Sequence, residues 1–141
     1  MKNKIFLASD HGGFSLKDSI YFFLKEKNMN VVDLGCKSLE PVDYPDYAKL
    51  LASKIEHNNS LGIIFCGTGI GISIAANRFS HVRSALCTSV EMASMSRKHN
   101  NANVLALGER IITKELAKEI VFKFLNTKFE KGRHLLRINK I

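Results

Sequence analysis

A cysteine stands at the point where a buried-looking strand meets a glycine-rich turn. The apolar run 63–65 ends at Cys66, and Gly67, Gly69 and Gly71 follow it. Glycines in such a turn let backbone N–H groups point inward at the start of the next helix, where the helix dipole favours negative charge. The same dipole stabilises a thiolate, which can act as a base or a nucleophile. The run therefore predicts an anion cradle beside a reactive Cys66.

A buried cysteine more often serves as a small apolar core residue. We keep that interpretation for Cys36 and Cys87, whereas the strand-end position favours chemistry for Cys66. Thr68 lies in the same turn and can donate its hydroxyl proton to an oxyanion.

The better-known glycine patterns do not fit this turn. A dinucleotide fingerprint, G-x-G-x-x-G, needs its third glycine at position 72, which is Ile72. A cysteine phosphatase loop would place an arginine at that same position. The Gly-Lys-Ser/Thr ending of a Walker loop is missing as well. A general anion or oxyanion cradle is what remains.

Other candidate groups follow other predicted strands. Asp10 and His11 come after the first strand, Arg110 comes after the fifth, and the segment after the fourth strand is a further candidate. In an open parallel sheet, ligands bind beyond the carboxyl ends of the strands, so these groups should share one cleft with Cys66. The alternatives are that Asp10 caps a helix and that His11 is an ordinary surface histidine.

The pair His99-Asn100 follows the fourth predicted helix. Histidine carries protons near neutral pH and asparagine forms neutral hydrogen bonds, so the pair can handle hydroxyl protons beside a thiolate base. On spacing alone, such a pair is more often a helix cap.

Short apolar runs alternate with helical patterns along the chain. The predicted strands are 4–8, 31–34, 62–65, 84–87 and 104–107, and the predicted helices are 15–27, 47–56, 70–79, 91–98 and 114–125. Parallel neighbours need crossover connections, and strands that are apolar throughout are buried on both faces. The alternation predicts an α/β fold, a Rossmann-like three-layer α/β/α sandwich with a five-stranded parallel sheet.

Composition narrows the class of protein. A chain of 141 residues is long enough for one domain with a core and too short for two ordinary ones, so we expect a single domain, 1–141. The net charge of +8 suits nucleic acid, an anionic membrane or a phosphorylated small molecule. The basic C-terminal segment has no base-stacking pattern beyond Phe129, which makes nucleic acid the weaker partner.

The first residues and the cysteines indicate where in the cell the protein is expected. The initial apolar stretch ends at Ala8, shortly before Asp10, so neither a signal peptide nor a membrane-spanning helix is expected. Three widely spaced cysteines without a C-x-x-C pair indicate free thiols, with neither disulfides nor a zinc site. We expect a cytoplasmic protein that associates with neither membrane nor nucleic acid.

Six segments carry a more specific signal. They are Asp10-His11-Gly12-Gly13, Asp43-Tyr44-Pro45, the run from Cys66 to Arg78, Arg97-Lys98-His99-Asn100 with Asn103-Val104-Leu105, Gly108-Glu109-Arg110, and Gly132-Arg133-His134 with Arg137. Together they resemble the family of ribose-5-phosphate isomerase B, which also includes allose-6-phosphate and galactose-6-phosphate isomerases. The resemblance covers nearly the whole chain.

The resemblance implies an aldose–ketose isomerase of the pentose phosphate pathway. Ribose 5-phosphate and ribulose 5-phosphate would interconvert through a cis-enediolate, with neither a metal nor an organic cofactor. Cys66 would be the base that moves a proton between C1 and C2. His99, helped by Asp10, would open the sugar ring.

The resemblance also implies a set of substrate contacts. Thr68 and the other turn residues would stabilise the enediolate oxygen, Asn100 would hold sugar hydroxyls, and Tyr44 would line the site. The turn residues are Gly67, Thr68, Gly69, Ile70 and Gly71. The groups expected on the phosphate are His11, Arg110, Arg133 and Arg137, the last two from a neighbouring subunit; arginine forks match phosphate geometry.

One branch of the family replaces the cysteine and uses a glutamate four residues later as base. Position 66 is Cys66 and position 70 is Ile70, so the chain resembles the cysteine branch. A homodimer, or a homotetramer, with shared active sites is implied, and the tail at about 128–141 would contact the neighbouring subunit. The tail stops soon after Arg137, which would weaken that contact rather than the chemistry. The alternatives are a hexose-6-phosphate isomerase and, less favoured, a non-catalytic sugar-phosphate sensor.

Overall fold

Five strands form one parallel sheet in the computed structural model, which describes residues 3–56 and 59–141. The strands are β1 (Lys4–Ser9), β2 (Val31–Asp33), β3 (Ser60–Cys66), β4 (Ser84–Leu86) and β5 (Val104–Gly108). Their order across the sheet is β2-β1-β3-β5-β4, and every neighbouring pair is parallel. The predicted five-stranded parallel sheet is confirmed.

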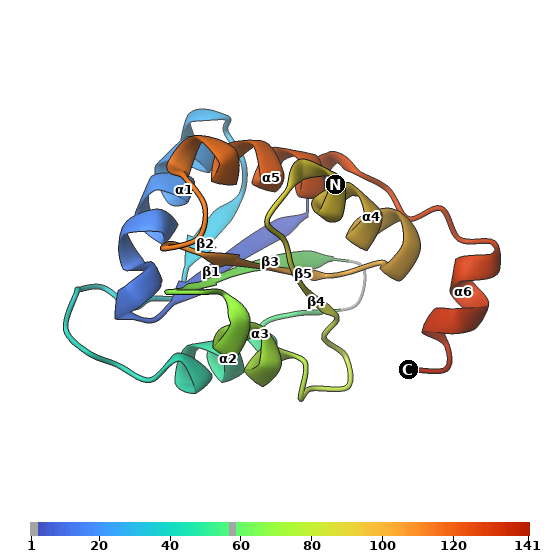
Figure 1. The fold of residues 1–141 in the computed structure, drawn as a ribbon, viewed down its shortest axis with the longest axis horizontal. Helices are drawn as coiled ribbons and strands as arrows, with labels where there is room; N and C mark the ends of the chain where they lie inside the picture. Colours follow the sequence, from blue (N-terminus) through green and yellow to red (C-terminus); the bar gives the residue numbers. More distant parts are fainter. Residues whose placement is uncertain (1–2, 57–58) are drawn as a thin grey trace.

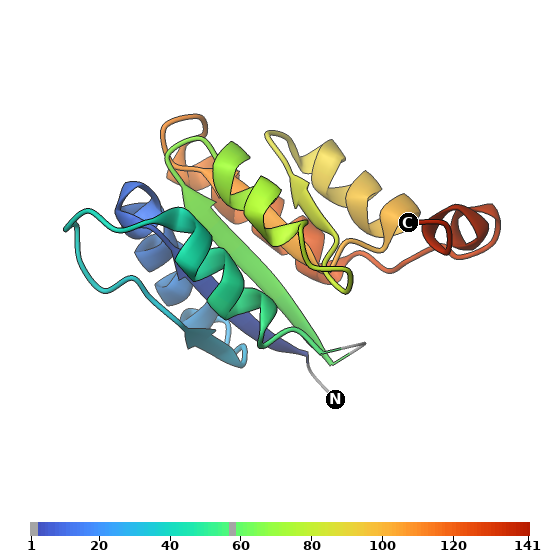
Figure 2. The same ribbon diagram turned by 90° about the horizontal axis from the view of Figure 1, so that it is seen from below.

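Helices cover both faces of the sheet, as Figures 1 and 2 show. One face carries α1 (Phe14–Glu26), α4 (Val90–Asn100) and α5 (Lys114–Asn126), and the other carries α2 (Tyr44–Ala52) and α3 (Ile70–Ala76). Each connection between parallel strands is a crossover through one of these helices. The three-layer α/β/α arrangement is therefore confirmed.

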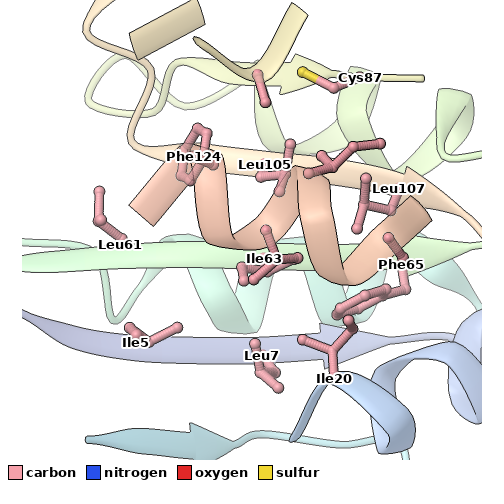
Figure 3. Packing of buried hydrophobic residues seen from close by; sticks show 14 of the residues in the cluster. Ile5, Leu7, Ile20, Leu61, Ile63, Phe65, Cys87, Leu105, Leu107 and Phe124 are labelled. Carbon is pink, nitrogen blue, oxygen red and sulfur yellow. The ribbon is translucent and has the colours of Figure 1, made fainter. Parts of the chain in front are cut away.

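The central strand β3 supplies apolar side chains to both cores. Leu61, Ile63 and Phe65 point into the core beneath α1 and α5, which Figure 3 shows. Ile64 and Cys66 belong to the opposite core, beneath α2 and α3. Full burial of one such side chain contributes roughly 1.5–3 kcal/mol. A strand buried on both faces gives the rigid support from which Cys66 emerges.

Two helices differ from the sequence prediction by three residues or more at an end, and the other three by one or two. Helix α2 begins at Tyr44 instead of Tyr47, because Asp43 is extended and Pro45 fits the first turn of a helix, where no N–H is needed. It also ends at Ala52, before the predicted Glu56. Helix α3 ends at Ala76 instead of Phe79.

Two short elements lie outside the predicted pattern. A 3-10 helix, η1 (His11–Gly13), joins β1 to α1, and the basic tail contains α6 (Arg133–Ile138). Helix α6 stands apart from the sheet at the end of α4 (Figures 1 and 2). Within the described residues, no helix combines the length and the apolar character needed to cross a bilayer.

Candidate active site

A hollow of about 350 Å³ opens at the carboxyl edge of the sheet. It is lined by Asp10, His11, Gly12, Tyr44, Cys66, Gly67, Thr68, Ile70, Gly71 and Arg110. These residues follow β1, β3 and β5 or begin α2, so the predicted convergence of three strand ends is confirmed. The chain leaves the adjacent strands β1 and β3 in opposite directions, which is where open sheets bind ligands.

The segment after β4 does not join this hollow. Strand β4 lies at the edge of the sheet, and β5 separates it from β3. The prediction for that segment is wrong, because the sequence order of the strands differs from their order in space.

Cys66 is the last residue of β3 and is held by the turn that follows. Its side chain is buried at 5% exposure but borders the hollow. The Gly69 N–H donates to the Cys66 Sγ at 3.0 Å. Gly69 has a φ of +78°, a left-handed conformation that glycine adopts without strain, and this conformation aims its N–H back at the sulfur. A donor fixed on the sulfur stabilises a negative charge there.

Arg110 lies against the same turn. Its N–H donates to the Gly67 carbonyl oxygen at 2.9 Å, and a Cβ at position 67 would stand only 3.0 Å from the Arg110 Nη1. A side chain at position 67 would therefore displace the guanidinium. Tyr44 approaches Gly71 in a similar way, since a Cβ there would lie 2.7 Å from the tyrosine Cζ. The glycines bring a cation and an aromatic ring close to Cys66.

Thr68 is exposed at the tip of the turn. Its Oγ1 accepts a hydrogen bond from the Ile70 N–H at 3.2 Å. The hydroxyl proton is then left available for donation, and its donation to an oxyanion stays a prediction.

Asp10 is buried at 7% exposure and caps η1, since its Oδ1 accepts from the Gly13 N–H at 3.1 Å. The capping interpretation is confirmed, and it is compatible with a role in the hollow because a carboxylate has further acceptor capacity.

His11 is oriented by a contact that the sequence did not predict. The Val42 N–H donates to the His11 Nδ1 at 3.1 Å. Because Nδ1 accepts, the neutral ring carries its proton on Nε2 and offers that N–H as a donor. The connection between β2 and α2 thus selects the tautomer of His11. No local pattern reveals a contact between residues so far apart in sequence.

An ion pair between a fully buried lysine and a partly buried aspartate supports the loop after β2. Lys17, fully buried in α1, donates to both carboxylate oxygens of Asp33 at 2.7 and 2.8 Å. Asp33 also accepts the Gly35 N–H at 2.9 Å, and the Gly35 carbonyl accepts the Ser9 N–H at 2.8 Å. Burial alone would raise the pKa of Asp33, but the hydrogen bonds from Lys17 and Gly35 and the charges of Lys17 and Lys37 outweigh it and lower that pKa. The pair ties the loop to the end of β1 at the hollow.

His99 and Asn100 lie at the opposite edge of the sheet. They form the last turn of α4, which starts near the carboxyl ends of the strands and returns to the amino end of β5. Eleven residues at about 1.5 Å each make α4 roughly 16 Å long. Within one chain, His99 and Asn100 therefore lie away from the hollow around Cys66.

The last turn of α4 is anchored by two arginines. Arg83 donates to the Asn100 carbonyl at 3.1 Å and to the Asn101 carbonyl at 3.0 Å. Arg97 donates to the carbonyls of Ala102 and, at 3.2 Å, Thr127. Carbonyl groups at a helix C-terminus attract cations. Burial lowers the pKa of both arginines, and the charge of Arg83 lowers that of Arg97 further, yet both guanidiniums remain protonated.

The predicted phosphate ligands of the tail lie near His99. Arg133 and Arg137 are exposed on α6, and His134 of the same helix stacks on the His99 ring, with ring centroids 4.4 Å apart. The chain therefore carries two groups of candidate residues. Cys66 belongs to one and His99 to the other.

Known proteins match nearly the whole length of this chain. The family model described as Ribose/Galactose Isomerase matches residues 5–141. Ribose-5-phosphate isomerase B of Escherichia coli is 45% identical over 139 residues, which cover 98% of this chain and 93% of the relative.

Solved structures agree with that match. The ribose 5-phosphate isomerase of Thermotoga maritima has a TM-score of 0.96 at 50% identity, covering 99% of this chain and 97% of its own. Ribose-5-phosphate isomerase B of Mycoplasma genitalium, solved with bound ribulose 5-phosphate, has a TM-score of 0.95 at 46% identity, covering 99% and 94%. The matched region includes every residue that lines the hollow.

Proposed function

This chain belongs to the Ribose/Galactose Isomerase family, and we propose that the hollow around Cys66 is one half of its active site. The chain is an aldose–ketose isomerase that interconverts ribose 5-phosphate and ribulose 5-phosphate. The position of Cys66 carries the proposed mechanism, since its sulfur borders the hollow and accepts the Gly69 N–H.

Cys66 acts as the base. Its thiolate takes the proton from C2 of the open-chain aldose, and the negative charge moves to the oxygen on C1. The hydroxyl proton passes from the oxygen on C2 to the oxygen on C1, and the thiol returns its proton to C1. A ketose with its carbonyl at C2 results, and no atom is gained or lost.

The turn after Cys66 stabilises the enediolate. The first N–H groups of α3 have no acceptor within the helix, and the Thr68 hydroxyl proton is available beside them. Fixed donors aimed at a developing oxyanion are often the largest single contribution to catalysis. Gly67, Gly69, Ile70 and Gly71 form the backbone of this cradle, in which the Gly69 N–H donates to the Cys66 sulfur and the Ile70 N–H to the Thr68 oxygen.

The phosphate group binds at the other side of the same hollow. His11 offers its Nε2–H, and the exposed guanidinium of Arg110 adds a positive charge and paired donors. Tyr44 lines the opening next to Gly71.

A second copy of the chain completes the site. His99, Asn100, Arg133 and Arg137 cannot reach Cys66 of their own chain, because they lie at the far edge of the sheet. We assign ring opening to His99 of the neighbouring copy, assisted by Asp10, with Asn100 on the sugar hydroxyls. The two tail arginines bind the phosphate.

Exposed apolar side chains suit such an assembly. They lie on α3, α4 and α6 and include Ile70, Ile74, Met92, Met95, Leu135 and Leu136. Helices α4 and α6 contact each other, and exposed apolar side chains on adjacent elements are typical of protein interfaces. A homodimer in which each copy gives both groups of residues accounts for them, and a tetramer would pair two such dimers.

Three free cysteines suit a reducing cytoplasm.

The test is a coupled isomerase assay with purified protein, ribose 5-phosphate, allose 6-phosphate and galactose 6-phosphate, in the presence of a chelator. We expect turnover of ribose 5-phosphate with the highest kcat/KM and no loss of rate with chelator. A higher kcat/KM for either hexose phosphate would favour the hexose isomerases of the family. Absence of turnover with all three would refute the enzyme assignment.

A further inference from the structure

Two histidines and a carboxylate meet near the end of α4. They are His99 of α4, His134 of α6 and Glu130 of the connection before α6, and one ligand atom from each lies within 4.8 Å of the others. Glu130 and His134 have no part in the proposed isomerase mechanism.

Backbone contacts hold these three side chains together. The Glu130 N–H donates to the Lys98 carbonyl at 3.1 Å, which ties the connection to α4 one residue before His99. The His134 Nε2 stands 3.7 Å from the Glu130 Oε2, and the imidazoles of His99 and His134 are stacked with planes 17° apart. The cluster thus joins α4 to the tail.

The spacing suits a small divalent cation. Bonds of about 2.0–2.2 Å in tetrahedral geometry place ligand atoms roughly 3.3–3.6 Å apart. The Glu130 and His134 atoms, 3.7 Å apart, are already near that spacing. His99 completes the set once its ring tilts out of the stack. Two imidazoles and one carboxylate, with a position left for water, are donors that Zn²⁺ accepts readily.

The charges around the cluster weaken the binding of a cation. Arg133 and Arg137 lie on α6 together with His134 and repel a divalent ion. The expected affinity is therefore micromolar rather than that of a structural zinc site.

We propose that Zn²⁺ binds His99, Glu130 and His134 and thereby inhibits the isomerase reversibly. Binding of the metal follows from the cluster alone. Inhibition rests on the proposed function, because a metal on His99 withdraws the nitrogen that would open the sugar ring.

Binding is tested by calorimetric titration of Zn²⁺ into untagged protein that carries Cys66→Ser, which removes the competing thiol. We expect one micromolar site per chain. Glu130→Gln and His134→Gln should each weaken binding by at least about tenfold, the size of loss that even outer-shell changes produce. The matched control is His81→Gln, because His81 bonds to the Ala52 carbonyl, away from the cluster. Equal affinities in all four proteins would overturn the site.

Inhibition is tested by isomerase assays with an intact Cys66. Zn²⁺ should inhibit the unmodified enzyme, and chelator should restore its rate. His134→Gln should keep the basal rate and need at least about tenfold more Zn²⁺ for the same inhibition. Equal inhibition of both proteins would place the inhibitory metal elsewhere and overturn the proposal. A chain without isomerase activity would refute the proposed function, while the calorimetry would still decide the metal site.

Discussion

Mixing two inactive variants of this chain should restore activity. The first variant, Cys66→Ala, removes the proposed base, and the second, His99→Asn, removes the proposed ring-opening group. Within one chain these residues lie at opposite edges of the sheet. Helix α4, which runs from one edge to the other, is roughly 16 Å long. If each active site takes Cys66 from one copy and His99 from the other, then both homodimers contain only damaged sites.

The heterodimer differs from both homodimers. Its two sites are unequal, because one combines both substitutions and the other has an intact Cys66 facing an intact His99. Random pairing of equal amounts makes about half of the dimers heterodimers, each with one intact site out of two. The mixture should therefore reach about a quarter of the wild-type kcat per chain. The assay is the coupled isomerase reaction after the two variants are unfolded together and refolded.

A matched control uses two substitutions from the same side. Arg110 lies against the turn that follows Cys66, so Cys66→Ala mixed with Arg110→Ala leaves every site with one damaged residue. This mixture should show only the average of its two components. Restoration in the control, or its failure in the Cys66 and His99 mixture, would refute a site shared in the way described.

Three further predictions concern other parts of the chain. Lys17→Met should lower the free energy of unfolding at pH 7 by up to about 3 kcal/mol, the lower end of the loss for a buried pair, because Asp33 is partly exposed and keeps Lys37 as a partner. The pKa of Asp33 is lowered in the folded state, so the pair stabilises the protein above the unfolded value of about 3.9, and urea titrations should show the difference from wild type shrinking as the pH falls below about 4. Burial raises the pKa of Cys87 to about 11, so mass spectrometry should find Cys87 unmodified by iodoacetamide at pH 8 in the folded protein, and modification there would contradict its burial. Arg137→Ala should raise the KM for ribose 5-phosphate more than it lowers kcat, whereas Lys140→Ala, an exposed neighbour, should change neither, and an unchanged KM for Arg137→Ala would exclude it from the phosphate site.

The hollow could be predicted from sequence because its signals are local. A glycine turn after a buried strand marks Cys66, and a general rule of parallel sheets brings Asp10 and Arg110 to the same edge. The location of His99 at the opposite edge could have been predicted from the same rule of parallel sheets. A crossover helix runs back to the amino edge of the sheet, so a residue in its last turn lies far from the strand ends.

Other features depend on contacts between distant segments. The bond from Val42 to His11 and the pair of Lys17 with Asp33 join residues that local patterns treat as unrelated. A single lysine within a helical pattern gives no sign that it is fully buried. The sequence pattern did not predict the tail helix α6. Six residues that include two arginines are too few to show a clear helical periodicity.

The most direct test of the account is the turnover of Cys66→Ala with ribose 5-phosphate. If Cys66 is the base, kcat should fall by at least about a hundredfold, the usual contribution of a positioned base, while calorimetry shows ribose 5-phosphate bound with nearly wild-type affinity. A variant that keeps its kcat within about tenfold of wild type would contradict the assignment of Cys66 as the proton-transfer base.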